Sequence, residues 1–169
     1  MGAFIGHRGS VNCLAVSSAA SILASGSNDG TVRLWDTRTR ETKNALDAKQ
    51  SAVATIAFSP DGKLIAAGCA DGAMFVWNTA DGTRVWQNSG KGKSIRSVAM
   101  LPDGKGVLTG EAGGRVALWR LDDGGVTAEL VGHKKNVNSV AVSRTTHFAC
   151  QPNKNGNTPL ERGRQLRSR

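Results

Sequence analysis

The sequence of 169 residues predicts an all-β fold built from repeated four-stranded antiparallel sheets. The first observation is a strict period of 42 residues between three tryptophans, Trp35, Trp77 and Trp119. The second is a column of tight turns in the same register, Asp29-Gly30, Asp71-Gly72 and Gly113-Gly114. The third is a set of four short strand-like segments in every period. No insertion or deletion separates the copies, so chance placement of a few aromatic residues does not explain the pattern.

The first strand of each unit is expected where aligned segments carry apolar or small side chains on both faces. These segments are Val11 to Val16, Val53 to Phe58, Ile95 to Met100 and Val137 to Val142. A strand with one solvent-exposed face would alternate apolar residues with charged ones. Because neither face does so here, we expect each first strand to lie between two neighbouring sheets.

The second and third strands follow at fixed distances within each unit. The second strand is expected over Ile22 to Ser25, Leu64 to Ala67 and Val107 to Thr109. In two units it follows the turns Pro60-Asp61-Gly62 and Pro102-Asp103-Gly104, where proline presets φ and glycine supplies the left-handed position. The Asp-Gly turn then reverses the chain into a third strand. That strand is expected over Thr31 to Trp35, Ala73 to Trp77 and Arg115 to Trp119.

A more polar fourth strand completes each unit and suits a solvent-facing outer edge. It is expected over Thr42 to Leu46, Thr83 to Gln87 and Val126 to Leu130. The units therefore span about residues 6–47, 48–89 and 90–131, with a partial fourth unit over 132–143. One period before the first outer strand lies Met1 to Phe4, so the chain is expected to begin within the outer strand of a preceding unit.

A period of this length, with Gly6-His7 early and Trp35-Asp36 late, is typical of β-propeller repeats. Closed rings hold about 4–8 blades, so three complete blades and the start of a fourth predict an incomplete ring. We therefore expect either a fragment of a larger propeller or a protomer that self-associates to cover its open blade edges. The sequence does not choose between these alternatives.

Residues 144–169 are expected to form a disordered basic tail. They contain six Arg or Lys residues and the single acid Glu161, and so supply +5 of the formal net charge of +9. Pro159 falls in the register of a third strand, where it would remove a hydrogen-bond donor. Such a tail is most often solvated. The alternative is a segment that binds nucleic acid by counterion release.

Several function classes find no support in the sequence. No apolar run approaches the roughly 18–20 residues that span a bilayer, and Met1 to His7 is too short for a signal peptide. The scattered Cys13, Cys69 and Cys150 match neither a disulfide framework nor a zinc site. No phosphate loop, catalytic carboxylate pair or metal-ligand spacing is present. We expect an intracellular protein, cytoplasmic or nuclear, that is not an enzyme and uses no cofactor, metal or membrane.

The segment DGTVRLWD, residues 29–36, preceded by Gly6-His7, closely resembles the WD40 repeat family. The resemblance covers about residues 4–142 and recurs in three aligned units. It implies a β-propeller whose rims and central opening form a platform for other proteins, without catalysis. It therefore implies a scaffold or adaptor for protein-protein interaction.

WD40 blades often contain a buried hydrogen-bonded chain of Trp, Ser or Thr, His and Asp. The resemblance maps this chain onto Trp35, Ser25, His7 and Asp29 in the first unit. The second unit departs from it with Lys49 and Ala67, and the third with Lys91 and Gly113 beside a matching Thr109. Blade 1 is therefore expected to be held together best by this hydrogen-bonded chain. The same residue types also suggest a hydrolase, but no nucleophile elbow or second oxyanion donor accompanies them.

Trp35-Asp36-Thr37-Arg38 also resembles the Trp-Asp-x-Arg box of substrate receptors in cullin-type ubiquitin ligases. Arg38 would then offer its fork of N–H donors to an adaptor protein. The alternative is a surface arginine in a turn.

Partner-binding residues are expected, by similarity to WD40 proteins, just after the Gly-His column and just before the turn aspartate. They are Arg8, Ser10, Asn28, Gln50, Ser94, Lys134 and Asn136. Trp86 stands outside the repeated tryptophan column, on an outer strand. It is expected either to be an exposed anchor for a partner or to be covered by a neighbouring loop.

Overall fold

The chain folds into short β-strands, and the part of it that the computed structural model describes contains no helix. The described residues are 3–17, 19–49, 51–88, 90, 92–130 and 132–143, together with the backbone of 148–152. The all-β prediction is therefore confirmed. None of the described residues belongs to a helix long and apolar enough to cross a membrane.

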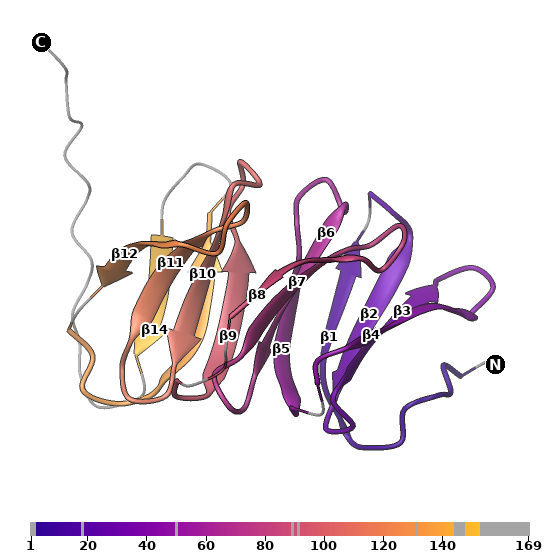
Figure 1. Ribbon diagram of the computed structural model, residues 1–169, viewed down its shortest axis with the longest axis horizontal. Coiled ribbons are helices and arrows are strands. Elements are labelled where there is room, and N and C mark those ends of the chain that lie inside the picture. Colours follow the sequence, from indigo (N-terminus) through magenta and orange to yellow (C-terminus); the bar gives the residue numbers. More distant parts are fainter. Residues whose placement is uncertain are drawn as a thin grey trace, which may run out of the picture.

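Three four-stranded antiparallel sheets, named blades 1 to 3, follow one another along the chain (Figure 1). Blade 1 contains β1 (Val11–Ser17), β2 (Ile22–Ser27), β3 (Thr31–Asp36) and β4 (Thr42–Asp47). Blade 2 contains β5 (Val53–Phe58), β6 (Leu64–Cys69), β7 (Met74–Asn78) and β8 (Arg84–Gln87). Blade 3 contains β9 (Ile95–Met100), β10 (Gly106–Glu111), β11 (Val116–Arg120) and β12 (Val126–Leu130). Within each blade the strands pair in chain order, as predicted.

The described part of blade 4 is a two-stranded sheet of β13 (Val137–Val142) and β14 (Phe148–Pro152). We expected a disordered tail from residue 144 onward, yet β14 lies in that range and pairs with β13, Val142 facing Phe148. The free edge of β13 needs hydrogen-bond partners, and the uncharged run from Phe148 to Cys150 can supply them. Residues 144–147 and 153–169, with Pro159 and Glu161, lie outside the described residues.

Each first strand carries a β-bulge near its start, because the pairing register shifts there by one residue. The bulged residues are Asn12, Ala54, Arg96 and Asn138. A bulge redirects the extra side chain out of the regular pleat. Asn12 Nδ2 donates to the carbonyl of Val53 at 2.9 Å, and Arg96 Nε donates to Asn138 Oδ1 at 2.9 Å. The bulges therefore link first strands of successive blades.

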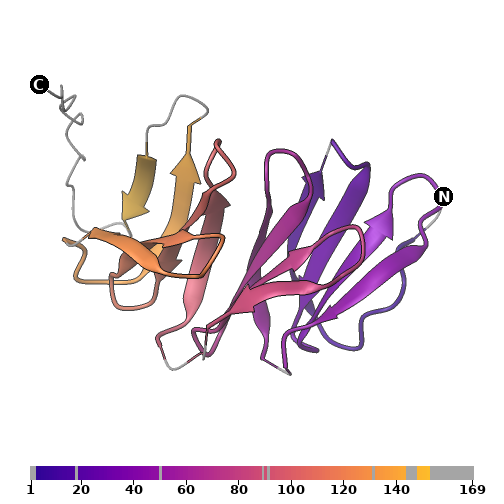
Figure 2. The ribbon, with the colours of Figure 1, turned by 45° about the horizontal axis from the view of Figure 1, so that its top comes forward.

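Three hydrophobic cores lie between consecutive blades. Leu34 of blade 1 packs in one cluster with Ile56 of blade 2, and Val76 of blade 2 packs in another with Val98 of blade 3. The third cluster joins Leu108, Val116, Val137 and Val140. The first strands of blades 2 and 3 thus lie between two sheets, as predicted from their two apolar faces, whereas for β1 the prediction is wrong, since Leu14 on one face is 64% exposed. Figure 2 shows the sheets side by side in chain order.

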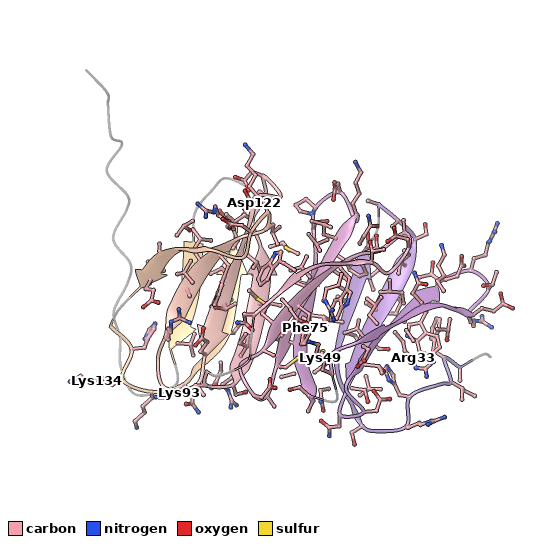
Figure 3. All side chains as sticks on the ribbon, viewed as in Figure 1. Arg33, Lys49, Phe75, Lys93, Asp122 and Lys134 are labelled. Carbon is pink, nitrogen blue, oxygen red and sulfur yellow. The ribbon has the colours of Figure 1, made fainter. Side chains whose placement is uncertain are left out.

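The loops lie at two opposite ends of the blades. One end carries the turns between second and third strands and the segments that lead into the first strands; we call it the Asp-Gly rim. Its tight reversals place Gly30 at φ 78° and Gly72 at φ 83°, which favours glycine. The remaining turns form the opposite rim. In Figure 3, Lys93 and Lys134 lie at the lower edge, which is the Asp-Gly rim, and Asp122 lies at the upper edge.

Candidate functional site on the Asp-Gly rim

Blade 1 contains a continuous hydrogen-bonded chain that ends at the Asp-Gly rim. Trp35 Nε1 donates to Ser25 Oγ at 2.8 Å, and Ser25 Oγ lies 2.7 Å from His7 Nε2. His7 Nδ1 lies 3.0 Å from Asp29 Oδ2. If Nδ1 carries the proton, every donor in this chain meets one acceptor: the indole donates to the hydroxyl, the hydroxyl to the imidazole and the imidazole to the carboxylate. The structure thus brings together the four residues mapped from the family resemblance.

Asp29 also organises the backbone around it. Its carboxylate accepts from the amides of Arg8 at 2.8 Å and Thr31 at 3.0 Å, and from the Thr31 hydroxyl at 2.7 Å. Burial by itself would raise the pKa of Asp29, but the hydrogen bonds from Thr31, Arg8 and His7 outweigh it and lower the pKa well below its usual range. The ionised carboxylate therefore fixes the segment before β1 to the turn before β3.

Ser25 is in no position to act as a nucleophile. Its side chain is buried, with only 4% of the residue exposed, and its hydroxyl is engaged by both Trp35 and His7. These four residues therefore form a buried structural hydrogen-bond chain and not a hydrolytic triad open to a substrate.

Within the described residues, no group of three or more His, Cys, Asp or Glu side chains is arranged to hold a metal ion. Burial raises the pKa of the Cys13 thiol to about 11, so this thiol stays protonated.

Blade 2 replaces the polar chain with aromatic packing. Lys49, in the histidine column, is exposed, while Ala67, in the serine column, is buried. Trp77 instead stacks on Phe75, with ring centroids 5.3 Å apart and an angle of 11° between the planes. Only the turn carboxylate is retained, because Asp71 Oδ1 still accepts from the amide of Ala73 at 2.9 Å.

Blade 3 builds a different polar network, which the sequence reasoning missed. Trp119 Nε1 donates to Thr109 Oγ1 at 2.9 Å, and Thr109 Oγ1 lies 3.4 Å from Glu111 Oε1. Arg115 binds Glu111 at 2.7 Å and Glu129 at 2.6 Å. Burial raises the pKa of Glu111, and Arg115 partly offsets this effect. A carboxylate and an arginine therefore stand in for the histidine and aspartate of blade 1. Lys91, in the histidine column, lies outside the described residues.

The sequence did contain a signal for this network. Glu111 occupies the column in which blades 1 and 2 have Ser27 and Cys69, both fully buried. A charged residue in a buried column requires a charged partner, and Arg115 is the nearest cation along the chain.

The expected partner-binding residues fall mainly on one surface. Arg8, Ser10 and Asn28 lie together on the Asp-Gly rim of blade 1, where the amide of Asn28 donates to the carbonyl of Ser10 at 2.9 Å. In blade 3 the carbonyl of Ser94 accepts from Ala112 in the equivalent bond, at 2.8 Å.

The remaining expected positions divide between the rims. Asn136 Oδ1 accepts from the amide of Gly113 at 3.0 Å, and Lys134 is exposed in the same loop. Arg38 is exposed on the opposite rim, where its amide donates to Asp36 Oδ1 at 2.8 Å. Gln50 lies outside the described residues. The Asp-Gly rim therefore gathers the described candidates except Arg38.

Trp86 packs between blades. Its ring stacks on Trp119 of the next blade, with centroids 6.3 Å apart, and a side chain on Gly124 would overlap it. The turn between β11 and β12 thus covers Trp86, which agrees with the second of the two expectations. Its indole N–H is buried without a partner in the described structure.

Comparison with known proteins places this architecture among WD40 propellers. A family model described as the N-terminal β-propeller domain of nucleolar protein 10-like proteins matches residues 3–157. WD repeat-containing protein 18 of Bos taurus is 48% identical over 46 residues, which are 27% of this chain and 11% of that protein. The chain therefore spans about a tenth of the length of the curated relatives it matches.

Solved structures show the same fold. The WD40 repeats of RRP9 superpose with a TM-score of 0.76 at 21% identity, over 82% of this chain and 43% of that one. The computationally designed Ika4 protein superposes with a TM-score of 0.73 at 24% identity, over 89% of this chain and 95% of that one. These identities establish the fold alone. The WD40 prediction is confirmed, with antiparallel four-stranded blades as expected.

Proposed function

We propose that this chain, which belongs to the family of nucleolar protein 10-like N-terminal β-propeller domains, is a non-enzymatic scaffold that binds other proteins through its Asp-Gly rim. WD40 propellers generally act as interaction platforms, and each blade here presents equivalent loops on that rim. A family named after a nucleolar protein also favours a location inside the cell, in the nucleus or cytoplasm.

The observation that carries the proposal is the rigid support beneath exposed polar groups. Arg8, Ser10 and Asn28 expose their side chains, while their backbones are tied to Asp29 or to one another. Binding residues that are held in place lose less conformational entropy when a partner docks. Loops carried on a rigid scaffold are the usual location of binding residues.

The test is quantitative co-purification of the tagged chain from cells of its own source. We expect the double variant Arg8→Glu/Asn28→Ala to lose one or more proteins that the wild type retains. The control is Lys105→Glu, which reverses an exposed charge on the opposite rim. A protein set identical for wild type and the Asp-Gly rim variant would refute the proposal.

A second candidate, a substrate receptor of a cullin-type ubiquitin ligase, depends on Arg38. Its exposure and the Asp36-capped turn beside it leave the guanidinium accessible to an adaptor. In the same co-purification, selective loss of a cullin adaptor from Arg38→Ala, with Asp-Gly rim partners retained, would favour this candidate. Nucleic-acid binding by the basic tail, residues 144–169, is the third candidate. Salt-sensitive RNA retention that survives deletion of residues 153–169, which spares β14 and removes five of the six basic residues, would exclude it.

A further inference from the structure

The two rims carry charge in different ways. On the opposite rim, three cations stand beside acids: Lys43 lies 3.8 Å from Asp36 and Lys63 lies 3.9 Å from Asp61. Arg120 likewise pairs with Asp122 and Asp123. The Asp-Gly rim exposes a set of basic side chains that we call the rim cations. They are Arg8, Lys49, Lys93, Arg96, Lys134 and Lys135.

The rim cations have no ion-pair partner among the described residues. Most acids on the same rim are already engaged by other groups. The Asp29 carboxylate accepts hydrogen bonds from His7 and Thr31, and Arg115 pairs with both Glu111 and Glu129, so its single positive charge offsets one of these two carboxylates. Asp47 and Asp71 are exposed but only cap backbone amides. The six rim cations and Arg115 outnumber the five carboxylates of this rim, so the rim keeps a net positive charge, which attracts an acidic partner.

The turn of blade 3 lacks the carboxylate that the turns of blades 1 and 2 contain. In blades 1 and 2 the amides of Thr31 and Ala73 donate to the turn carboxylates of Asp29 and Asp71. Blade 3 has Gly113 at this position, and the amide of Arg115 has no acceptor among the described residues. The side chain of Lys93 lies directly against Gly113, because a methyl group on that glycine would overlap it.

A cavity of about 300 Å³ lies between blades 2 and 3, and its lining includes Gly92, Arg115 and the carboxylate of Glu111. An incoming carboxylate beside Gly113 would meet the Lys93 ammonium and the free Arg115 amide, both of which favour an anion. Lys134 and Lys135 lie in the loop before β13, which reaches the same turn through the bond from Gly113 to Asn136. The Asp-Gly rim thus combines several exposed cations with one defined site for a carboxylate, beside Gly113.

The side chains around the rim cations suit a peptide better than a nucleic acid. Single-stranded nucleic acids bind through exposed aromatic rings on which bases stack. Trp35, Trp77 and Trp119 are buried, and among the described residues Phe4 is the only exposed aromatic side chain. Exposed Ser10, Asn28 and Asn136 offer hydrogen-bonding groups to a peptide backbone instead.

We propose that the rim cations bind an acidic peptide segment of a partner protein, with one of its carboxylates held beside the Gly113 turn by Lys93 and the amide of Arg115. This inference rests on the proposed scaffold function and names the chemical class of its partner. It also assigns Lys93 as the anchoring cation.

Fluorescence anisotropy of a labelled poly-glutamate peptide tests the inference. We compare the wild type with Lys93→Glu/Lys134→Glu/Lys135→Glu and with a control, Lys63→Glu/Arg84→Glu/Lys105→Glu, which makes the same change in net charge on the opposite rim. The Asp-Gly rim variant is expected to bind at least about tenfold more weakly than the control, since several exposed charge pairs are lost together. Because Gly113 has φ 85°, charge reversal of Lys93 is a cleaner test than Gly113→Asp.

Three outcomes would overturn the inference. Equal weakening in both triple variants would mean that only net charge matters. Labelled oligo-uridine that binds more tightly than poly-glutamate, with the same dependence on Lys93, would assign the surface to nucleic acid. Absence of poly-glutamate binding would reject an acidic partner, while rim-dependent co-purification of proteins would still uphold the scaffold proposal. Matching urea midpoints of the variants would show that folding is unaffected.

Discussion

His7 holds two segments of blade 1 together, because its ring contacts both Ser25 and Asp29. His7 belongs to the segment before β1, whereas Ser25 and Asp29 belong to β2 and the turn that follows it. Its ring satisfies a hydroxyl and a carboxylate that would otherwise lose a partner in a partly buried environment. Each of these contacts stabilises the fold chiefly because, without it, a buried polar group would be left unpaired at a cost in free energy.

We expect His7→Ala to lower the free energy of unfolding by about 1–3 kcal/mol, the usual range for a buried polar group left without its partner. The matched control is Lys49→Ala, which changes the same repeat position in blade 2, where the side chain is exposed. That control is expected to change stability by less than about 0.5 kcal/mol. Urea denaturation of both variants measures the difference. Equal losses in the two variants would contradict a pinning role for His7.

The lowered pKa of Asp29 predicts a pH dependence. A carboxylate with a lowered pKa in the folded state stabilises the protein above its unfolded pKa of about 4, and this stabilisation is lost as pH falls. The difference in urea midpoint between wild type and Asp29→Asn is therefore expected to shrink between about pH 5 and pH 3. Other carboxylates titrate in both proteins, so the difference isolates Asp29. A constant difference over this range would show that Asp29 gives no pH-linked stability.

In blades 1, 2 and 3, the equivalent repeat positions around the third-strand tryptophan form three different sets of side-chain contacts. Blade 1 uses a histidine-aspartate chain, blade 2 an aromatic stack of Trp77 on Phe75, and blade 3 the Arg115–Glu111 pair. In each case the tryptophan at the end of the third strand is buried. This repeat position therefore requires a buried tryptophan ring. The residues around the ring can vary, provided that buried polar groups among them are hydrogen-bonded.

Trp86 and Trp119 allow a matched test, because their rings stack on each other but only one indole N–H has a partner. Trp119 Nε1 donates to Thr109, whereas Trp86 Nε1 is buried without a partner in the described structure. Trp119→Phe is therefore expected to cost about 1–3 kcal/mol more than Trp86→Phe, since it leaves the Thr109 hydroxyl without its donor. Thermal and urea unfolding of the two variants measure this. A larger loss for Trp86→Phe would show that ring size, and not the hydrogen bond, decides stability.

The strand segments and the Asp-Gly turns could be predicted from the sequence, because the period aligns three copies of every strand, whereas the bulge in each first strand left no such signal. The network of blade 3 was missed because Glu111 and Arg115 match no repeat consensus, although a charged residue in a buried column, four positions from an arginine, signals such a pair. β14 was missed for a similar reason. Its pairing with β13 is decided by a free strand edge, whereas the sequence around it has lost the turn and tryptophan signals.

Each blade is stabilised because the neighbouring blades cover apolar side chains on its two faces. In blades 2 to 4 the residues Ile56, Val98 and Val140 are 7%, 7% and 6% exposed, because the preceding blade packs on them. Leu14 occupies the same column in β1 and is 64% exposed, and Val16 is 68% exposed. The face of β1 turned away from blade 2 therefore presents apolar area that the other blades bury.

We expect this face to make the purified chain self-associate, because contiguous apolar patches on soluble proteins favour contact with another surface. Light scattering should show an average mass that rises with concentration, and Leu14→Lys/Val16→Lys should lower it toward that of a monomer. The control is Val126→Lys, on the outer strand β12, where the valine is 42% exposed but no equivalent position is covered by a blade. Association that persists in the Leu14→Lys/Val16→Lys variant would place the contact elsewhere, and a wild type that stays monomeric at all concentrations would refute the prediction.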